Sequence, residues 1–282
     1  MKRAVLIAGA ILLGMVALLA FVAVLQAQPE TVVYSHAGGQ DLHIDLYRPA
    51  AAAKPSPALL LIHGGGWVGG DKRDMAGFAT ALVPKGFFCA AVQYRFADKA
   101  KWPAQLDDVQ TAVRFLRAHA SEYKIDPKRI GAVGGSAGGH LAQCLGVRDT
   151  RDPHPTEFPG VSSRVQVVWN IFGPVDFTQT FSDLVKGLIK GLVGDDTPAN
   201  LKDAGPVFFA STKSAPTFFL QGKKDPLVPW QQAQEMADKL KSLGVEANLN
   251  LVDDMVHDPD MSKPEVVKAV QRGIEWLEKH LK

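Results

Sequence analysis

The sequence predicts an α/β domain, with a mostly parallel central sheet flanked by helices on both faces. Past residue 30, apolar runs of strand length alternate with longer amphipathic stretches, a pattern typical of parallel sheets covered by helices. The chain has 282 residues, of which 46% are apolar and 21% charged. This composition is that of a globular protein and argues against disorder, collagen and disulfide-dense small folds.

Eight segments are predicted as strands. Thr31–Tyr34 and Leu42–Arg48 form an opening antiparallel pair, because apolar residues alternate in the second segment and Gly38-Gly39-Gln40 supplies a turn between the two. The other six are more densely apolar, as expected of strands covered on both faces. They are Ala58–His63, Phe87–Tyr94, Ile130–Gly134, Val165–Phe172, Thr217–Gln221 and Asn248–Val252.

Helices are predicted where apolar residues recur every three or four positions. The four clearest are Pro103–His119, Ala137–Gly146, Gln231–Leu243 and Pro264–His280. A fifth, Phe181–Val193, gathers its apolar residues on one stripe that includes Leu184 and Leu188. This pattern fits a helix packed on the domain, and it equally fits a wall or cap over a substrate pocket.

The N-terminal segment differs from the rest of the chain. Ala4–Leu25 is a run of 22 uncharged residues preceded by Lys2 and Arg3. Its length favours a membrane helix, while the Gln26-Ala27-Gln28-Pro29 stretch after it is compatible with signal cleavage. We therefore expect residues 1–27 to be a signal peptide or an N-terminal membrane anchor, and residues 28–282 to be the catalytic domain. Because basic residues stay cytoplasmic, either alternative places that domain outside the cytoplasm.

The charge balance argues against nucleic-acid binding. The chain has 31 basic and 29 acidic residues, and Lys2 and Arg3 are the only charges among the first 27, so the remainder is neutral. No basic cluster follows residue 3, and such a cluster is what displaces counterions from nucleic acid.

The two cysteines, Cys89 and Cys144, lie in segments predicted to be buried. We expect two free thiols rather than a disulfide.

A nucleophile is predicted at Ser136. Gly134-Gly135-Ser136-Ala137-Gly138 directly follows a predicted strand and opens a predicted helix. This places the serine on a sharp strand-to-helix turn, where flanking glycines permit the close approach of neighbouring backbone and the hydroxyl projects above the sheet.

A second motif predicts an oxyanion hole. His63-Gly64-Gly65-Gly66-Trp67 follows the apolar strand segment Ala58–Ile62, and such a loop supplies backbone N–H groups to the oxyanion of acyl transfer. The expected donors are the N–H groups of Gly65, Gly66 and Ala137. His63 is interpreted as a residue that stabilises the loop, and Trp67 as either a packed hydrophobe or a pocket wall.

A serine nucleophile needs a base and an acid that orients the base. In this architecture they follow in the order serine, acid, histidine, so only His257 and His280 come late enough. His280 lies near the end of the last helix, which favours His257. Asp225 follows the strand Thr217–Gln221 and is the expected acid. Asp253 and Asp254 are rivals ranked behind it.

These motifs together resemble the α/β-hydrolase superfamily, and within it the exported esterases and lipases with His-Gly-Gly-Gly-Trp. The resemblance extends from about residue 31 to residue 282. It includes Gln93-Tyr94-Arg95 and the segment Trp102–Asp108, in which Asp107 and Asp108 are interpreted as carboxylates that anchor a helix. The nearest branch contains feruloyl and acetyl-xylan esterases and hormone-sensitive-lipase-like carboxylesterases. The chain departs from it at Val256 and Asp258-Pro259, which flank His257 where the family commonly has glycine.

The resemblance implies hydrolysis of carboxylic esters without a metal or cofactor. Ser136 is the expected nucleophile, with Trp67 and Trp230 as expected substrate contacts. The expected substrate is a small-molecule or polysaccharide-linked ester, and residues 4–25 are a possible membrane attachment. Two alternatives remain at this point: amide hydrolysis by the same residues, as in a peptidase or deformylase, and a non-catalytic, membrane-tethered binding module.

Overall fold

The computed structural model describes residues 29–50, 54–152 and 155–282. The expectation for residues 1–27 lies outside these ranges. None of the helices within them has the length and hydropathy needed to cross a lipid bilayer.

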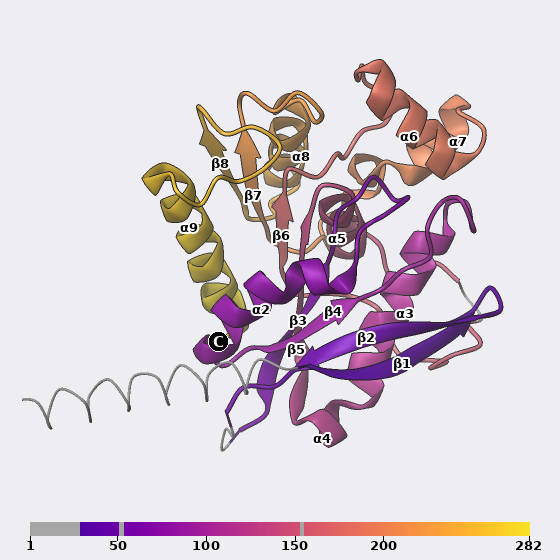
Figure 1. Ribbon diagram of the computed structural model, residues 1–282, viewed down its shortest axis with the longest axis vertical. Helices are drawn as coiled ribbons and strands as arrows, with labels where there is room; N and C mark the ends of the chain where they lie inside the picture. Colours follow the sequence, from indigo (N-terminus) through magenta and orange to yellow (C-terminus); the bar gives the residue numbers. More distant parts are fainter. Residues whose placement is uncertain (1–28, 51–53, 153–154) are drawn as a thin grey trace, which may run out of the picture.

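The described residues form one eight-stranded sheet in the order β1-β2-β4-β3-β5-β6-β7-β8 (Figure 1). β2 is antiparallel to both of its neighbours, and the pairs from β4 to β8 are all parallel. This arrangement confirms the predicted α/β-hydrolase fold and the opening antiparallel pair. The strands are β1 Glu30–Ala37, β2 Gln40–Tyr47, β3 Ser56–Ile62, β4 Phe88–Val92, β5 Ile125–Gly135, β6 Val168–Ile171, β7 Thr217–Gly222 and β8 Ala247–Val252.

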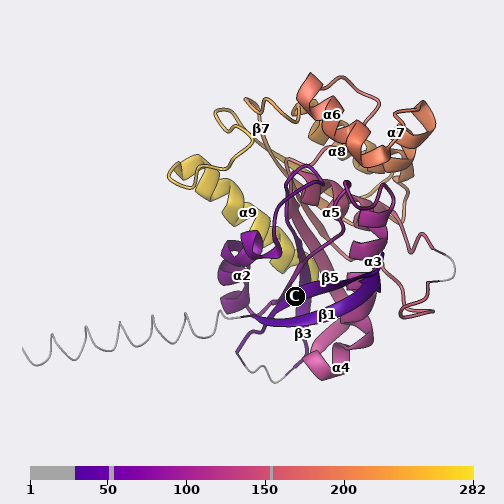
Figure 2. The same cartoon turned by 45° about the vertical axis from the view of Figure 1, so that its right-hand side comes forward.

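Helices cover both faces of the sheet because its central strands are apolar on both sides. In β3, Leu60 packs with α3 and α5, whereas Leu59 and Leu61 point the other way and pack with α2 and α9. α8 covers the outer part of the first face, against Phe219 of β7. Figures 1 and 2 show the two layers. The helices are α2 Ala76–Leu82, α3 Ala104–Ala118, α4 Ala120–Tyr123, α5 Ala137–Val147, α6 Asp183–Val193, α7 Pro198–Ala204, α8 Gln231–Ser242 and α9 Pro264–Leu281.

The short helices α2, α4 and α7 were not predicted from periodicity. Each has at most seven residues, too few for a helical period to be visible in the sequence. α2 nevertheless has a topological role: β3 and β4 are parallel neighbours, and a parallel pair needs a crossover connection.

One residue of the predicted α6 stripe is not buried. Val185, Ile189 and Leu192 pack into the core as expected, but 65% of Leu184 is exposed. Leu184 and the half-buried Leu188 lie four residues apart and therefore form one edge of the stripe, which turns away from the core. α6 projects beyond the carboxyl ends of the strands (Figure 1).

Both cysteines are buried free thiols, as predicted. Cys89 belongs to the core layer shared with α2 and α9, whereas Cys144 of α5 belongs to the layer on the opposite face. The sheet therefore separates them, which explains why they do not pair. Burial raises the pKa of the Cys144 thiol to about 12 and that of the Cys89 thiol further still, so both stay protonated.

Candidate active site

Ser136 occupies the strand-to-helix turn between β5 and α5. Its backbone lies at φ 54° and ψ −121°, a conformation that non-glycine residues rarely adopt. The two ends of the turn nearly touch, since a Cβ atom on Gly134 would lie 2.2 Å from the carbonyl oxygen of Gly138. The Ser136 N–H donates to the carbonyl of Ile171 in the next strand, at 2.9 Å. The sheet thus holds the strained residue in place and leaves its hydroxyl facing the loops above.

A continuous chain of hydrogen bonds links Ser136, His257 and Asp225. His257 Nε2 lies 2.8 Å from Ser136 Oγ, and His257 Nδ1 lies 2.8 Å from Asp225 Oδ2. The carboxylate accepts a hydrogen bond, so Nδ1 carries the proton and Nε2 is left to accept one from the serine hydroxyl. This tautomer is the one that a general base acting on Ser136 requires.

Both carboxylate oxygens of Asp225 accept hydrogen bonds from neighbouring residues. Its Oδ1 accepts the backbone N–H groups of Leu227 and Val228, both at 2.9 Å, and its Oδ2 also accepts the Gln221 side-chain amide at 3.0 Å. The Asp225 side chain has no exposed surface, whereas 19% of the His257 side chain is exposed. A buried carboxylate with this many donors fixes the orientation of the imidazole while its other edge remains accessible.

The loop that carries His257 packs against the loop that carries Asp225. A Cβ atom on Gly222 would lie 2.1 Å from the carbonyl oxygen of Met255, so only glycine permits this approach. The Lys224 N–H donates to that same carbonyl at 3.1 Å. Gly222 was not singled out in the sequence, although its place at the end of β7 and before Asp225 is visible there.

The alternative candidates for the acid and the base, Asp253, Asp254 and His280, make other contacts. Asp253 and Asp254 are exposed and pair with Lys223 and Lys224 respectively, at 2.7 and 2.5 Å. His280 on α9 bonds to the carbonyl of Trp276 and to Glu246. None of these three has a contact with Ser136 among the described hydrogen bonds and ion pairs.

The glycine loop after β3 lies beside the nucleophile. A Cβ atom on Gly64 would lie 3.4 Å from Ser136 Cβ, and the loop closes on itself through N–H groups of Val68 and Gly69 that donate to the Gly65 carbonyl. The loop thus lies beside Ser136 at Gly64, and Ala137 directly follows Ser136 in the chain. The Ala137 N–H is the first of α5 and lies at the positive end of the helix. Backbone donors of this kind can bind an oxyanion.

His63 is buried and supports this loop. Its ring stacks on Tyr94, with ring centroids 4.4 Å apart, and its Nδ1 lies 2.7 Å from the Gly64 carbonyl. The Tyr94 hydroxyl donates to the carbonyls of His63 and Gly64. Burial lowers the pKa of His63, so its ring stays neutral at pH 7. These contacts agree with the interpretation of His63 as a loop-stabilising residue.

The structure corrects the expectation for Trp67. The side chain is only 3% exposed, lies in the core against Phe177 and donates its indole N–H to His140 Nδ1 at 3.2 Å. A side chain with so little free surface cannot form a pocket wall, and the packed alternative is the right one.

Trp230, at the start of α8 and half-buried, remains a candidate contact with the substrate. α6 also reaches the site, because a Cβ atom on Gly66 would lie 3.0 Å from Leu188 Cδ1.

Two further residues at the site were missed in the sequence. Phe172 follows β6 with a strained φ of 42°, and its ring lies against His257, centroids 4.7 Å apart. No sequence signal distinguishes it from other apolar strand residues. His140 lies one helical turn after Ser136 and is fully buried. The only signal for His140 was its position on a predominantly apolar helix, four residues after Ser136.

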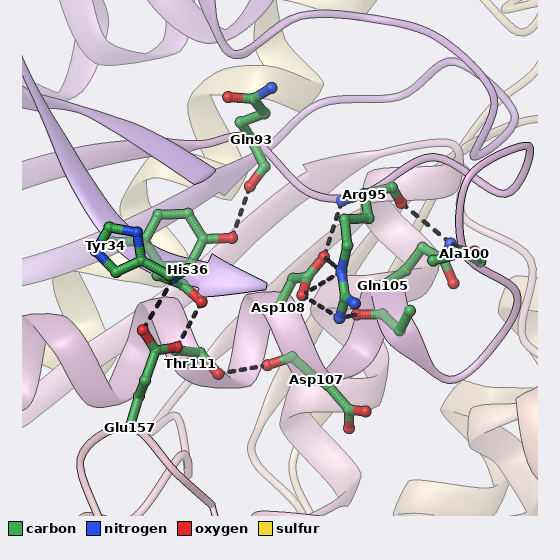
Figure 3. Close-up of polar contacts among 12 residues, drawn as sticks. Tyr34, His36, Gln93, Arg95, Ala100, Gln105, Asp107, Asp108, Thr111 and Glu157 are labelled. Atoms are coloured by element: carbon green, nitrogen blue, oxygen red, sulfur yellow. Dashed lines mark hydrogen bonds and ion pairs between the residues drawn. The ribbon is translucent and has the colours of Figure 1, made fainter. Parts of the chain in front are cut away.

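The Gln93-Tyr94-Arg95 and Asp107-Asp108 motifs meet beside β1 (Figure 3). Asp108 accepts from the Arg95 backbone N–H at 2.8 Å and pairs with its guanidinium at 2.6 Å, and Asp108 is nearly fully buried. Asp107 pairs instead with Arg151. The Asp108 ion pair ties α3 to the segment after β4, which agrees with an anchoring role.

Within the described ranges there is no cluster of three or more His, Cys, Asp or Glu residues that could hold a metal ion.

Comparisons with known proteins point in one direction. The BD-FAE family model matches residues 44–240. "Probable carboxylic ester hydrolase LipM" from Mycobacterium tuberculosis is 33% identical over 227 residues, which cover 74% of this chain and 53% of LipM. The chain thus spans about half the length of LipM, and the same is true of the esterases LipC and LipQ from that organism.

Two solved structures resemble the whole described fold. The thermophilic esterase Est2 of Thermogutta terrifontis superposes with a TM-score of 0.79 at 24% identity, covering 90% of this chain and 93% of Est2. An acetyl ester-xyloside bifunctional hydrolase from Caldicellulosiruptor lactoaceticus gives a TM-score of 0.78 at 23% identity, covering 89% and 96% of the two chains. At these identities the likeness shows a shared fold.

Proposed function

Because this chain belongs to the BD-FAE family, whose model matches most of it, we propose that it is a serine hydrolase that cleaves carboxylic esters. The observation that carries the proposal is the chain of hydrogen bonds from Ser136 through His257 to Asp225. The names of the relatives, which include a carboxylic ester hydrolase and esterases, support the choice of ester substrates.

The proposed reaction proceeds through an acyl-enzyme. Ser136 Oγ attacks the ester carbonyl while His257 Nε2 accepts the hydroxyl proton, and the same proton is then delivered to the departing alcohol. Asp225 keeps the imidazole in the required tautomer and stabilises its protonated form. Water, deprotonated by His257, then attacks the acyl-enzyme and releases the acid.

The oxyanion of each tetrahedral intermediate is proposed to bind the N–H groups of Gly65 or Gly66 and of Ala137. These donors belong to backbone that is fixed before substrate arrives, so they need little reorganisation as charge develops. The packing of the glycine loop beside Ser136 supports this assignment.

The test is hydrolysis of p-nitrophenyl esters from acetate to decanoate by residues 28–282, in parallel with Ser136→Ala. We expect hydrolysis by the unaltered protein and a loss of at least about 10⁴-fold in the variant. A fluorophosphonate should label Ser136, detected by mass spectrometry of the modified peptide. Folded protein that neither hydrolyses any ester nor takes up the label would overturn the proposal and favour a binding module.

We propose acetyl or feruloyl esters on plant polysaccharides as the natural substrates. The resemblance to feruloyl and acetyl-xylan esterases supports this, as does the structural likeness to the acetyl ester-xyloside bifunctional hydrolase from Caldicellulosiruptor. Release of acetate from acetylated xylan and of ferulate from feruloylated arabinoxylan would be compared with cleavage of p-nitrophenyl acetate and with cleavage of p-nitroanilide amides. Amide cleavage that outpaces ester cleavage would favour the amidase alternative.

We propose that the catalytic domain acts outside the cytoplasm, secreted or anchored through residues 4–25. The uncharged run after Lys2 and Arg3 supports this location. A fusion of the full chain to alkaline phosphatase, which is active only after export, should be active, and its membrane or soluble fractionation separates an anchor from a cleaved signal. A phosphatase-inactive fusion that accumulates in the cytoplasm would contradict the proposal.

A further inference from the structure

His140 is a buried histidine that the proposed reaction does not use. It lies on α5, four residues after Ser136, and has no exposed surface. Aromatic side chains surround its ring: Trp67 and Trp102 each lie 5.4 Å from it, and Phe177 lies 4.9 Å from it, measured between centroids. A polar side chain in such an apolar enclosure is costly unless both nitrogens are satisfied.

Both ring nitrogens have a partner, and the partners define one tautomer. The Trp67 indole can only donate, so His140 Nδ1 accepts its N–H at 3.2 Å. The Ala204 carbonyl can only accept, so His140 Nε2 carries the proton and donates it at 2.7 Å. The ring is therefore neutral and oriented, which suits it to fix the groups at its two ends.

Those groups belong to different segments around the oxyanion donors. Trp67 directly follows Gly66 and adopts a left-handed backbone conformation with φ 62°, which is strained for this residue type. Its carbonyl accepts the Ala97 N–H at 2.8 Å. Ala204 ends α7, the helix after α6, and Leu188 of α6 lies against Gly66.

We infer that His140 is a positioning residue that, through its hydrogen bond to Trp67, sets the glycine loop against α5 and so fixes the two halves of the oxyanion hole relative to each other. This inference rests on the proposed function. One half is the N–H of Gly65 or Gly66, which directly precede Trp67 in the chain. The other half is the N–H of Ala137, which lies on the same helix as His140, three residues before it. The bond from Trp67 to His140 links these two rigid pieces by a side-chain contact.

The consequence is a specific kinetic effect. If the bond is lost, the loop donors move relative to Ser136, and the oxyanion is less well bound although the ester still binds. A displacement of this kind lowers kcat and leaves KM nearly unchanged, because the donors act mainly in the transition state.

The experiment compares Trp67→Phe with Trp102→Phe. Each replacement keeps an aromatic ring beside His140 and removes one indole N–H. Trp67 donates to His140, whereas Trp102 donates to Asp203 at 2.7 Å and has no part in the glycine loop. We expect kcat for p-nitrophenyl acetate to fall about 10- to 100-fold in Trp67→Phe. For Trp102→Phe we expect a change within about twofold.

A trifluoromethyl ketone provides a readout that a loss of stability does not produce. It forms a tetrahedral oxyanion adduct with Ser136, so its inhibition constant should rise in Trp67→Phe by about the same factor as kcat/KM falls. A second pair of variants, at His140, tests the inference independently in case Trp67→Phe does not fold. His140→Asn keeps an acceptor in the position of Nδ1, whereas His140→Leu does not. We expect the asparagine variant to retain most of kcat and the leucine variant to lose about as much as Trp67→Phe.

Equal losses in Trp67→Phe and Trp102→Phe, or unchanged kcat in His140→Leu, would overturn the inference while the esterase proposal stands. If the unaltered protein hydrolyses no ester and Ser136 takes up no fluorophosphonate, the proposed function itself fails, and the positioning role fails with it.

Discussion

At the residue scale, the site depends on a few side chains whose surroundings leave them one orientation. Asp225 has its oxygens occupied by two backbone N–H groups and one side-chain amide besides His257. His257 packs on the ring of Phe172 and bonds at both nitrogens. Such fixed geometry lowers the barrier because little has to reorganise when the proton moves.

A comparison of two histidines tests this assignment. His257→Ala should lower kcat for p-nitrophenyl acetate by about 10⁴-fold or more, because the remaining serine has no base. His280→Ala should leave kcat within about twofold, since His280 bonds to Glu246 and has no described contact with the site. Steady-state kinetics on both purified variants decide the matter. An unchanged kcat in His257→Ala would exclude His257 as the base.

At the element scale, the functional groups lie on loops that follow strands β3, β5, β7 and β8. These strands are parallel, so their carboxyl ends meet at one edge of the sheet, and residues far apart in the chain become neighbours there. The loops also constrain one another, as Gly222 shows by its contact with Met255.

Gly222→Ala tests this packing of loop on loop. A methyl group there would meet the Met255 carbonyl, so the loop with His257 must shift, and we expect the free energy of unfolding to fall by about 1–3 kcal/mol and kcat to fall with it. Gly187→Ala, at an exposed position of α6, is the matched control, because nothing lies within 4 Å of its Cβ position. There we expect a gain of about 0.5–1 kcal/mol and unchanged kcat. Urea unfolding followed by circular dichroism measures both. Stability and kcat that do not change in Gly222→Ala would contradict the packing.

At the scale of the whole molecule, hydrophobic cores pack against both faces of the sheet. His140 lies in one of them and makes the free energy of unfolding depend on pH. Burial, opposed by the bond to the Ala204 carbonyl, lowers the pKa of His140 from 6.5 to about 4. Protonation would also place a proton on Nδ1, where Trp67 already donates. The unfolded chain therefore binds a proton at a pH where the folded protein does not.

The sign of the effect follows from that difference. The stability associated with neutral His140 is fully present above pH 6.5 and is lost as the pH falls from there toward 4, by up to about 3 kcal/mol. His63, whose pKa burial also lowers, acts in the same direction. We expect the difference in free energy of unfolding between the unaltered protein and His140→Asn to shrink as the pH falls from 7 to 4. Urea titrations at several pH values measure it, and a difference independent of pH would refute the prediction.

Much of this could be predicted from the sequence, for reasons that differ by element. The five long helices and the opening strand pair show a period and the other six strands are dense apolar runs, because burial on one or two faces dictates which positions are apolar. Ser136, Asp225 and His257 could be proposed because their motifs follow strand ends. α2 and α7 were missed because they are too short to display a period. The exposure of Leu184 was not predictable, because an amphipathic stripe does not reveal how wide the contact beneath it is.

The sequence by itself determined the order of strands and helices along the chain, the Ser136 turn, the glycine loop and the chain order of serine, acid and histidine. These are local properties, fixed by backbone sterics and by the period of burial. Only the tertiary structure decided that Trp67 is a buried hydrogen-bond donor and not a pocket wall, that Asp253 and Asp254 pair with lysines, and that His140 and Phe172 lie at the site. Such pairings join residues distant in the chain, and the contacts that select them exist only once the sheet has brought its strand ends together.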